Sequence, residues 1–479
     1  MTRSPASAAA TFPGTPLQLG DFVEIDCTDL IAKTGQAVGR APDGMVVYVL
    51  GPIPGERARV RIDVVKAKYA VGELVELLTH SRERVTPFCP VFGTCGGCQV
   101  QHFAYPAQLR WKRGIVANAL QRLGGLKDVR VGLPFGMDDP RAYRNKMALV
   151  VEKAGEATSF GFYAARSHDV VPIRACPVVM PQLDGVIGGL WAAVGDPAAA
   201  PAFTDALHVV ARAAHASGEG VVSVTTLRPS AALGGAAAAL AAHLPGTVGI
   251  ANSSEPSSEN AVMGRRQATV YGTAEMHERI GKVAFRVSPA SFFQVNSEMV
   301  GKIFAFLEPH LAGIGNVVDL YCGAGTFALF FAACGARVVG IEENPHAVRE
   351  ARANAALNAV EERVEFLAGR VDGMLRSKRG REALATADLV FLDPPRKGSD
   401  EATLTELVRT RVPRIWYLSC NPATLARDVA QLVDGGYRLG PVQPFDMFPQ
   451  TGHIEAVASL YRSDVAPTAF ALNEDGAVS

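Results

Sequence analysis

The chain has 479 residues, more than one typical domain holds, so two or three domains are expected. Hydrophobic residues make up 48% of it, and 47 Lys and Arg balance 47 Asp and Glu, so the zero net charge argues against a general polyanion binder. The sequence contains neither a run of about eighteen apolar residues nor a secretory signal, which predicts a cytoplasmic protein without a membrane span.

Short strand patterns dominate the N-terminal part of the chain. Residues 1–15 are rich in Ala, Ser, Pro and Thr and predict disorder. Residues 16–80 contain short alternating runs separated by turns, such as Arg57–Ile62, and this regular spacing predicts a small, OB-like β-barrel. Basic side chains on one barrel face, from Arg57 to Lys68, suit nucleic-acid binding and equally suit a solvated surface.

Residues 81–289 predict a central α+β domain that begins with a cysteine-rich stretch. Cys89, Cys95 and Cys98 lie close together, and Cys176 follows later. In a cytoplasmic chain such clustering indicates metal binding or catalysis rather than disulfides, and four thiolates suit zinc as well as an iron–sulfur cluster.

A basic stretch runs through the start of this central domain. Residues 110–174 hold twelve Lys and Arg against six Asp and Glu, and the cations include Arg144 and Lys146. This local excess suits contact with phosphates. On charge alone, a solvated surface is the better interpretation.

Residues 290–463 predict a doubly wound α/β domain, because short apolar runs alternate there with helical patterns. A strand beginning at Val317 leads into Gly323-x-Gly325, where glycines permit a sharp turn and close approach of a ligand. The next strand ends in Glu342, whose carboxylate can accept hydrogen bonds from two ribose hydroxyls. The third glycine of a dehydrogenase loop is absent.

Residues 464–479, which follow the last strand pattern, predict a disordered tail.

Two later strand ends carry further polar groups. Asp393 follows an apolar strand and precedes Pro394-Pro395, which places it beside the glycine loop at the carboxyl edge of the sheet. Cys420 ends the next strand, and Asn421-Pro422 predicts the start of a helix. The positive end of that helix dipole favours a thiolate at Cys420.

A last strand begins near Glu455 and completes a set of groups that suggests a reaction. Pyrimidine C5 is a poor nucleophile, but addition of a thiolate to C6 makes C5 able to take a methyl group from a sulfonium. A base must then remove the C5 proton so that the cysteine can leave. Cys420 suits the first role and Glu455 the last.

Five sequence blocks together resemble the RNA uracil-5-methyltransferases that carry an N-terminal TRAM domain. In chain order the blocks are Ser291–Asn296, Asp319–Gly325, Asp393–Gly398, Ser419–Pro422 and Gly452–Glu455. The predicted barrel is similar to the TRAM module, so the resemblance covers nearly the whole chain. It implies a Rossmann-like methyltransferase domain, a covalent Cys–C6 adduct and RNA as the partner.

The resemblance also implies roles for single residues. Gln294, Tyr321, Glu342 and Asp393 would contact S-adenosyl-L-methionine. Cys420 would be the nucleophile and Glu455 the base. Two further cofactor positions depart from the family, because Thr326 and Arg370 stand where members often have Asn.

The cysteine quartet is similar to the [4Fe–4S] site of the members that modify rRNA. The resemblance implies that Cys89, Cys95, Cys98 and Cys176 bind the cluster in a structural or RNA-docking role, and it favours iron–sulfur over zinc. It also favours 23S rRNA over tRNA as the substrate. A uridine inside folded RNA must leave its stack to reach Cys420, so we expect a flipped base, and a monomer suffices.

Three alternatives remain open from the sequence. The substrate could be a tRNA, since tRNA enzymes also occur with such a quartet. A methyltransferase acting on an exocyclic base amine would use Asp393-Pro-Pro without needing Cys420. A non-catalytic, RNA-binding iron–sulfur protein would not bind S-adenosylmethionine. A dehydrogenase explains neither Cys420 nor the quartet.

Overall fold

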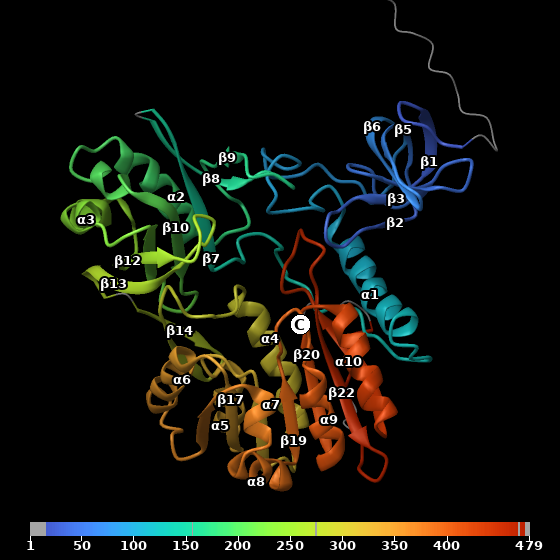
Figure 1. Cartoon of the computed structure of the whole chain (residues 1–479), viewed down its shortest axis with the longest axis vertical. Coiled ribbons are helices and arrows are strands. Elements are labelled where there is room, and N and C mark those ends of the chain that lie inside the picture. The colour runs from blue at the N-terminus through green and yellow to red at the C-terminus, as the bar shows by residue number, and fades with distance from the viewer. Residues whose placement is uncertain (1–15, 156, 274, 468–469, 475–479) are drawn as a thin grey trace, which may run out of the picture. The chain divides into compact units, whose positions relative to one another are not determined.

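The computed structural model describes residues 16–155, 157–273, 275–467 and 470–474, which divide into two compact units (Figure 1). Unit 1 consists of the chain up to Trp111 together with Phe448–His453, and unit 2 contains the rest. The segment 1–15 that was predicted to be disordered lies outside the described residues. Within the described ranges, no helix is long and apolar enough to cross a membrane.

Unit 1 is built on a six-stranded sheet in the order β1-β5-β6-β4-β3-β2. All neighbouring strands are antiparallel except β4 and β6. All six strands contribute buried side chains, such as Val23, Ile25 and Val60, to one apolar core, so the sheet curls around it as expected for a small barrel. The strands are β1 (Phe22–Asp26), β2 (Asp29–Leu30), β3 (Ala37–Arg40), β4 (Val46–Val49), β5 (Arg57–Val65) and β6 (Tyr69–Thr79).

The basic row on this sheet is balanced by acids. Arg59 contacts Glu24 and Glu76 at 3.0 Å each, and Arg61 contacts Glu73 at 2.6 Å. These pairs are exposed and contribute little to stability. The arginines of β5 therefore form a charge-balanced, solvated surface rather than an unpaired cationic strip.

Unit 2 begins within helix α1 (Tyr105–Arg122) and contains a seven-stranded central sheet, ordered β13-β12-β11-β10-β7-β8-β9. Helix α2 (Pro181–Val194) packs against β8 and β10, and α3 (Ala231–His243) packs against β12 and β13, with the short helix η1 (Ala200–Phe203) between them in sequence. The strands are β7 (Lys146–Ala154), β8 (Ala157–Tyr163), β9 (Val170–Pro172), β10 (Ala206–Ala213), β11 (Gly220–Thr226), β12 (Thr247–Pro256) and β13 (Gly264–Gly272).

Residue register distinguishes the two faces of the central sheet. Asn252 accepts a hydrogen bond from the backbone N–H of Ser230, the N-cap of α3, so its face carries that helix. Asn252 is paired with Val224, Val224 with Val209, and Val209 with Leu149. Side chains of neighbouring residues alternate between faces, so the opposite face carries Lys146, His208, Arg212 and Thr225.

The second seven-stranded sheet has the order β18-β17-β16-β19-β20-β22-β21 and confirms the predicted doubly wound, Rossmann-like domain. It is parallel from β18 to β20, whereas β22 runs antiparallel to both β20 and β21. Strand β19 is buried throughout, which explains its uninterrupted apolar sequence. The strands are β16 (Asn316–Leu320), β17 (Arg337–Glu342), β18 (Val364–Ala368), β19 (Leu389–Leu392), β20 (Arg414–Ser419), β21 (Tyr437–Phe445) and β22 (Glu455–Arg462).

Helices connect and flank these strands (Figure 1). A hairpin of β14 (Met276–Ile280) and β15 (Val283–Val287) precedes them. The chain order reverses between β16 and β19, and such a switch point opens a crevice at the carboxyl ends of the strands. The helices are α4 (Ser297–Leu307), η2 (Glu308–His310), α5 (Thr326–Ala333), α6 (Pro345–Leu357), α7 (Val371–Leu375), α8 (Lys378–Thr386), α9 (Glu401–Thr410) and α10 (Pro422–Asp434).

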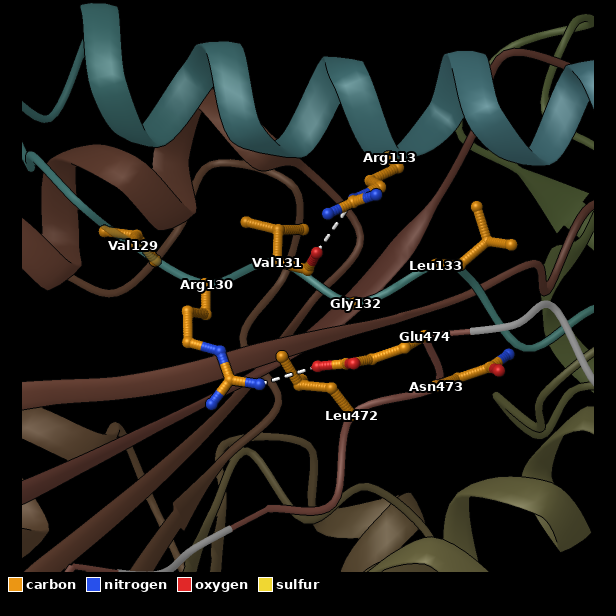
Figure 2. Close-up of a pocket in the computed structure, with 9 residues that line it drawn as sticks. All are labelled: Arg113, Val129, Arg130, Val131, Gly132, Leu133, Leu472, Asn473 and Glu474. Carbon is orange, nitrogen blue, oxygen red and sulfur yellow. Dashed lines mark hydrogen bonds and ion pairs between the residues drawn. The ribbon is translucent and has the colours of Figure 1, made fainter.

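Part of the C-terminal tail packs on unit 2. Phe470 is buried against Phe306 and Trp416, and the backbone carbonyl of Asn473 accepts a 2.7 Å hydrogen bond from Leu133. The tail borders a cavity of about 500 Å³, where Arg130 and Glu474 form an ion pair at 2.7 Å (Figure 2). Residues 470–474, in the segment predicted to be disordered, therefore make ordered contacts.

Candidate active site

The loop after β16 turns sharply in front of α5. Tyr321, Gly323 and Gly325 all have positive φ angles, of 64°, 54° and 89°. Glycine adopts this conformation freely, whereas a tyrosine held there is strained. Gly325 is the N-cap of α5 and packs against Ala351 and Leu329, whereas a side chain at Gly323 would meet open space. A ligand can therefore approach the backbone at Gly323, as the glycine spacing predicts.

Strand register brings three predicted cofactor residues into one row. Leu320 is paired with Ile341 of β17 and with Leu392 of β19, so the next positions, Tyr321, Glu342 and Asp393, end three adjacent parallel strands. The carboxyl edge of an open parallel sheet is the usual ligand site of this fold.

Hydrogen bonds hold the members of this row in place. One oxygen of Glu342 accepts from the backbone N–H of Gly323 at 3.1 Å, and the other accepts from Asn344 at 2.8 Å. The Tyr321 hydroxyl lies 2.9 Å from the hydroxyl of Ser399. Each carboxylate oxygen of Glu342 keeps a second lone pair for a ligand hydroxyl.

Gln294 reaches the row from the segment before α4. Its Nε2 donates to Oδ2 of Asp393 at 3.4 Å. The Asn145 side chain donates to the Gln294 carbonyl at 3.0 Å, and the Asn145 backbone N–H donates to Val295 at 2.9 Å. The four predicted cofactor residues thus come from four separate elements and meet at one edge of the sheet.

The predicted nucleophile and base are neighbours in register. Ser419 of β20 is paired with Ala456 of the antiparallel β22, so Cys420 and Glu455 occupy the next opposed positions. Asn421 caps α10 by accepting from the backbone N–H of Ala423 at 3.1 Å, so Cys420 does precede a helix start. Cys420 is half-buried and Glu455 is buried.

The electrostatics of this pair correct the expectation of a thiolate. Burial, together with the carboxyls of Glu455 and Asp393, raises the pKa of the Cys420 thiol to about 12, although the guanidinium of Arg396 opposes this. Burial and the nearby acids therefore outweigh the helix dipole, whose effect is about 1 kcal/mol. In the protein alone, Cys420 is a neutral thiol.

The pKa values of the acids around it are raised as well. Burial raises the pKa of Asp393 to about 7. The pKa of Glu455 lies well above its ordinary range because of burial and of Asp393, and Arg396 opposes both effects. Asp393, Cys420 and Glu455, which all become anions on losing a proton, thus lie in one apolar environment.

Three residues to which the sequence assigned no role also belong to this region. Asp319 in β16 is buried, and neither of its carboxylate oxygens has a hydrogen-bond partner among the described residues. Arg396 is exposed and acts on both Cys420 and Glu455. The Phe292 side chain is 73% exposed, two residues before Gln294. Two sequence signals could have indicated Asp319 and Arg396: an acid inside an apolar strand, and a cation directly after Asp-Pro-Pro.

Thr326 and Arg370, which depart from the family pattern, lie in different surroundings. Thr326 is the first residue of α5, directly after the glycine turn. The side chain of Arg370 is 70% exposed and pairs with Asp372 at 3.1 Å. Arg370 is therefore already engaged at the surface, next to the start of α7.

The cysteine quartet is divided between the two units. Cys89, Cys95 and Cys98 belong to unit 1, whereas Cys176 belongs to unit 2. Cys95 accepts a hydrogen bond from the backbone N–H of Gly97 at 3.4 Å, and none of the four forms a disulfide. In the described part of the chain, no three or more His, Cys, Asp or Glu side chains are gathered as metal ligands. The cluster therefore stays a prediction.

The residues at the sheet edge fit S-adenosylmethionine. The glycine turn leaves the backbone at Gly323 accessible, Glu342 retains lone pairs for hydroxyls, and the unpartnered oxygens of Asp319 lie in the strand that leads into the turn. Acids without a neighbouring counter-charge favour a cation, and the cofactor carries positive charge on its sulfonium and amino groups. The edge therefore has the features of a methyltransferase site.

Comparison with known proteins agrees with this class. Residues 17–75 match the TRAM domain, and residues 266–463 match the tRNA (uracil-5-)-methyltransferase family. A Bacillus cereus protein described as an uncharacterized RNA methyltransferase is 34% identical, over 93% of this chain and 98% of that protein. A protein of the same description from Thermosynechococcus vestitus is also 34% identical, over 93% of this chain and 99% of that protein.

A solved structure extends the comparison over most of the chain. The tRNA (uracil-54, C5)-methyltransferase of Pyrococcus abyssi, in complex with S-adenosyl-L-homocysteine, is 26% identical with a TM-score of 0.70. The match covers 91% of this chain and 99% of that one. The chain belongs to the TRAM-containing RNA uracil-5-methyltransferase family and is an S-adenosylmethionine-dependent RNA methyltransferase.

The buried carboxyl of Asp393 yields a prediction about pH and stability. Its pKa rises from 3.8 to about 7 on folding, so the folded state binds the proton more tightly and stability falls as pH rises between these values. Asp393→Asn has no charge to bury, so it should be more stable than the wild type at about pH 8, by on the order of 1–3 kcal/mol. Thermal unfolding without ligand, from about pH 4 to 8, measures this; the same pH dependence in both proteins would contradict it.

Proposed function

We propose that this enzyme methylates C5 of a uridine in RNA through a covalent adduct with Cys420. The observation that carries the proposal is the placement of Cys420 opposite Glu455, beside the row that ends in Asp393. A thiol and a carboxyl at one edge of the sheet supply the nucleophile and the base that this chemistry requires. Methylation of an exocyclic amine would need neither Cys420 as a nucleophile nor Glu455 as a base for the C5 proton.

The reaction can be followed through the bonds that change. The Cys420 thiolate adds to C6 of the uracil, and the displaced electron pair makes C5 nucleophilic. S-adenosylmethionine, when bound, supplies an electrophilic methyl group on a positively charged sulfur. Once C5 carries the methyl group, the Glu455 carboxylate takes the C5 proton, and the released electron pair restores the C5–C6 double bond and expels the thiolate.

The charges of the site couple this chemistry to cofactor binding. Burial raises the pKa of Asp393, Cys420 and Glu455, and neighbouring carboxyls also raise those of Cys420 and Glu455, which favours the protonated forms. A nearby positive charge lowers the pKa of all three, as Arg396 already does for Cys420 and Glu455. We infer that the thiolate and the basic carboxylate form when cationic cofactor is bound, which protects the free enzyme from unproductive thiol reactions.

For the substrate we favour a uridine of 23S rRNA over one of tRNA. The cysteine quartet supports rRNA, whereas the similar Pyrococcus abyssi enzyme is named for tRNA. The half-buried Cys420 cannot reach a base stacked in a helix, so the uridine must be flipped. A monomer contains every residue that the mechanism uses.

Mass spectrometry of nucleosides from 23S rRNA and tRNA of a deletion strain tests the choice of substrate. 5-Methyluridine should disappear from one rRNA position, and retention in both RNAs would reject C5 methylation.

Exchanges at the reacting pair should separate the two chemical steps. Cys420→Ala should abolish methylation, by at least about 10³-fold, while S-adenosylmethionine binding in calorimetry persists. Glu455→Gln should still form the adduct but fail to release it, so protein linked to RNA should accumulate on denaturing gels. Cys334→Ala, at the half-buried end of α5, serves as the matched control and should retain activity. Substantial methylation by Cys420→Ala would favour the exocyclic-amine alternative.

We also propose that the four cysteines hold a [4Fe–4S] cluster in a structural or docking role. The donor set, four cysteines outside any disulfide with a backbone N–H directed at Cys95, supports this, and no step of the reaction needs the cluster. Protein purified without oxygen should contain about four iron atoms and absorb visible light. Cys98→Ser should lose most of the iron, whereas Cys334→Ser should keep it. Stoichiometric zinc in place of iron would contradict the proposal.

A further inference from the structure

Three cations gather on the face of the central sheet that points away from α3. Lys146 of β7 is paired directly with Arg212 of β10, and Arg144 precedes Lys146 by two positions, on the same side of the chain. The Nε of Arg144 donates to the Lys146 carbonyl at 2.9 Å. Like charges directly opposite each other destabilise a sheet, so this arrangement needs an explanation.

Within the structure as described, Glu350 is the acid that acts on this cluster, and it acts on Arg212 rather than on Lys146. Burial, Arg212 and Arg144 together lower the pKa of Lys146 to about 8, and no acid opposes them. Only Glu350 acts favourably on Arg212, and one oxygen of Glu350 accepts from the Ser288 and Ser291 hydroxyls. Ion pairs among the described residues include neither Lys146 nor Arg144.

The buried arginine has unused donors. The side chain of Arg212 is only 1% exposed, and its Nη2 donates to the carbonyl of Ser291. Its Nε and Nη1 find no hydrogen-bond partner in the described structure. Leaving charged N–H groups buried and unpaired is costly, which favours a bound anion or water there. Lys146 and Arg144 are only half-buried, so a ligand can approach them from solvent.

The cluster adjoins the segment that carries Gln294. Asn145, between Arg144 and Lys146, donates to the carbonyls of Gln294 and Val295, and Arg212 donates to Ser291 three residues earlier. The exposed Phe292 lies in the same segment. The cations are therefore tied, through a few hydrogen bonds, to the part of the chain that also reaches Asp393.

We propose that Lys146 and Arg144, with Arg212 behind them, bind a backbone phosphate of the RNA beside the target uridine. This rests on the proposed function and names the part of the substrate that the central domain recognises. A flipped nucleotide has a phosphate on either side, and fixing one of them holds the base in register without reading sequence. The point charge of Lys146 and the planar guanidinium of Arg144 both suit phosphate oxygens.

The test is the salt dependence of RNA binding by the full-length protein. The probe is a fluorescein-labelled RNA hairpin with a uridine in its loop, and anisotropy measures its affinity at several salt concentrations. Lys146→Gln should weaken binding roughly tenfold at low salt and reduce the slope of log K against log salt by about 0.7 to 1. Lys146→Arg should restore most of the slope, and Lys378→Gln, which removes an exposed lysine of α8, should leave it unchanged.

Parallel measurements separate the other outcomes. If Lys146→Gln binds the hairpin with the wild-type slope, no phosphate contact exists and the proposal fails. If RNA binding is unchanged but calorimetry shows weaker S-adenosylmethionine binding, the anion is the cofactor carboxylate, which also overturns it. A Lys146-dependent slope in an enzyme that methylates no uridine would support the phosphate site and reject the proposed function instead.

Discussion

The burial of acidic groups that outnumber the nearby cations is the constraint on which the site depends. Asp319, Asp393, Glu455 and the Cys420 thiol end or adjoin strands at one edge, where water is largely excluded and Arg396 is the cation acting on the reacting pair. Each group is easier to bury neutral than charged. A positively charged ligand reverses that preference, so one property of the apolar edge serves both cofactor selection and control of the nucleophile.

The sheet topology makes this crowding possible. Three parallel strands end side by side and deliver Tyr321, Glu342 and Asp393, while the reversal to antiparallel pairing at β22 brings Glu455 back to the same edge. A wholly parallel sheet would have started β22 at the opposite edge. The antiparallel strand is therefore what places an acid opposite Cys420.

Much of this arrangement could be predicted from the sequence, because strand ends were marked by strong local signals. Apolar runs followed by glycine, Asp-Pro-Pro or Cys-Asn-Pro placed Tyr321, Asp393 and Cys420 at the correct edge. The two-residue strand β2 carries too little pattern to detect, and the contacts of Phe470 with Phe306 and Trp416 depend on packing between distant segments. The protonation state of Cys420 could not be predicted either, since burial and neighbouring acids appear only in three dimensions.

The opposed positions of Cys420 and Glu455 also limit how this protein can change over time. Their meeting depends on the pairing of Ser419 with Ala456, and side chains along a strand alternate between faces. Inserting one residue between Glu455 and Ala456 would turn Glu455 to the other side of the sheet while leaving the composition of the site intact. The loop between β21 and β22 can vary in length, but the direct succession of Glu455 and Ala456 at the start of β22 cannot change by one residue without moving the acid away from Cys420.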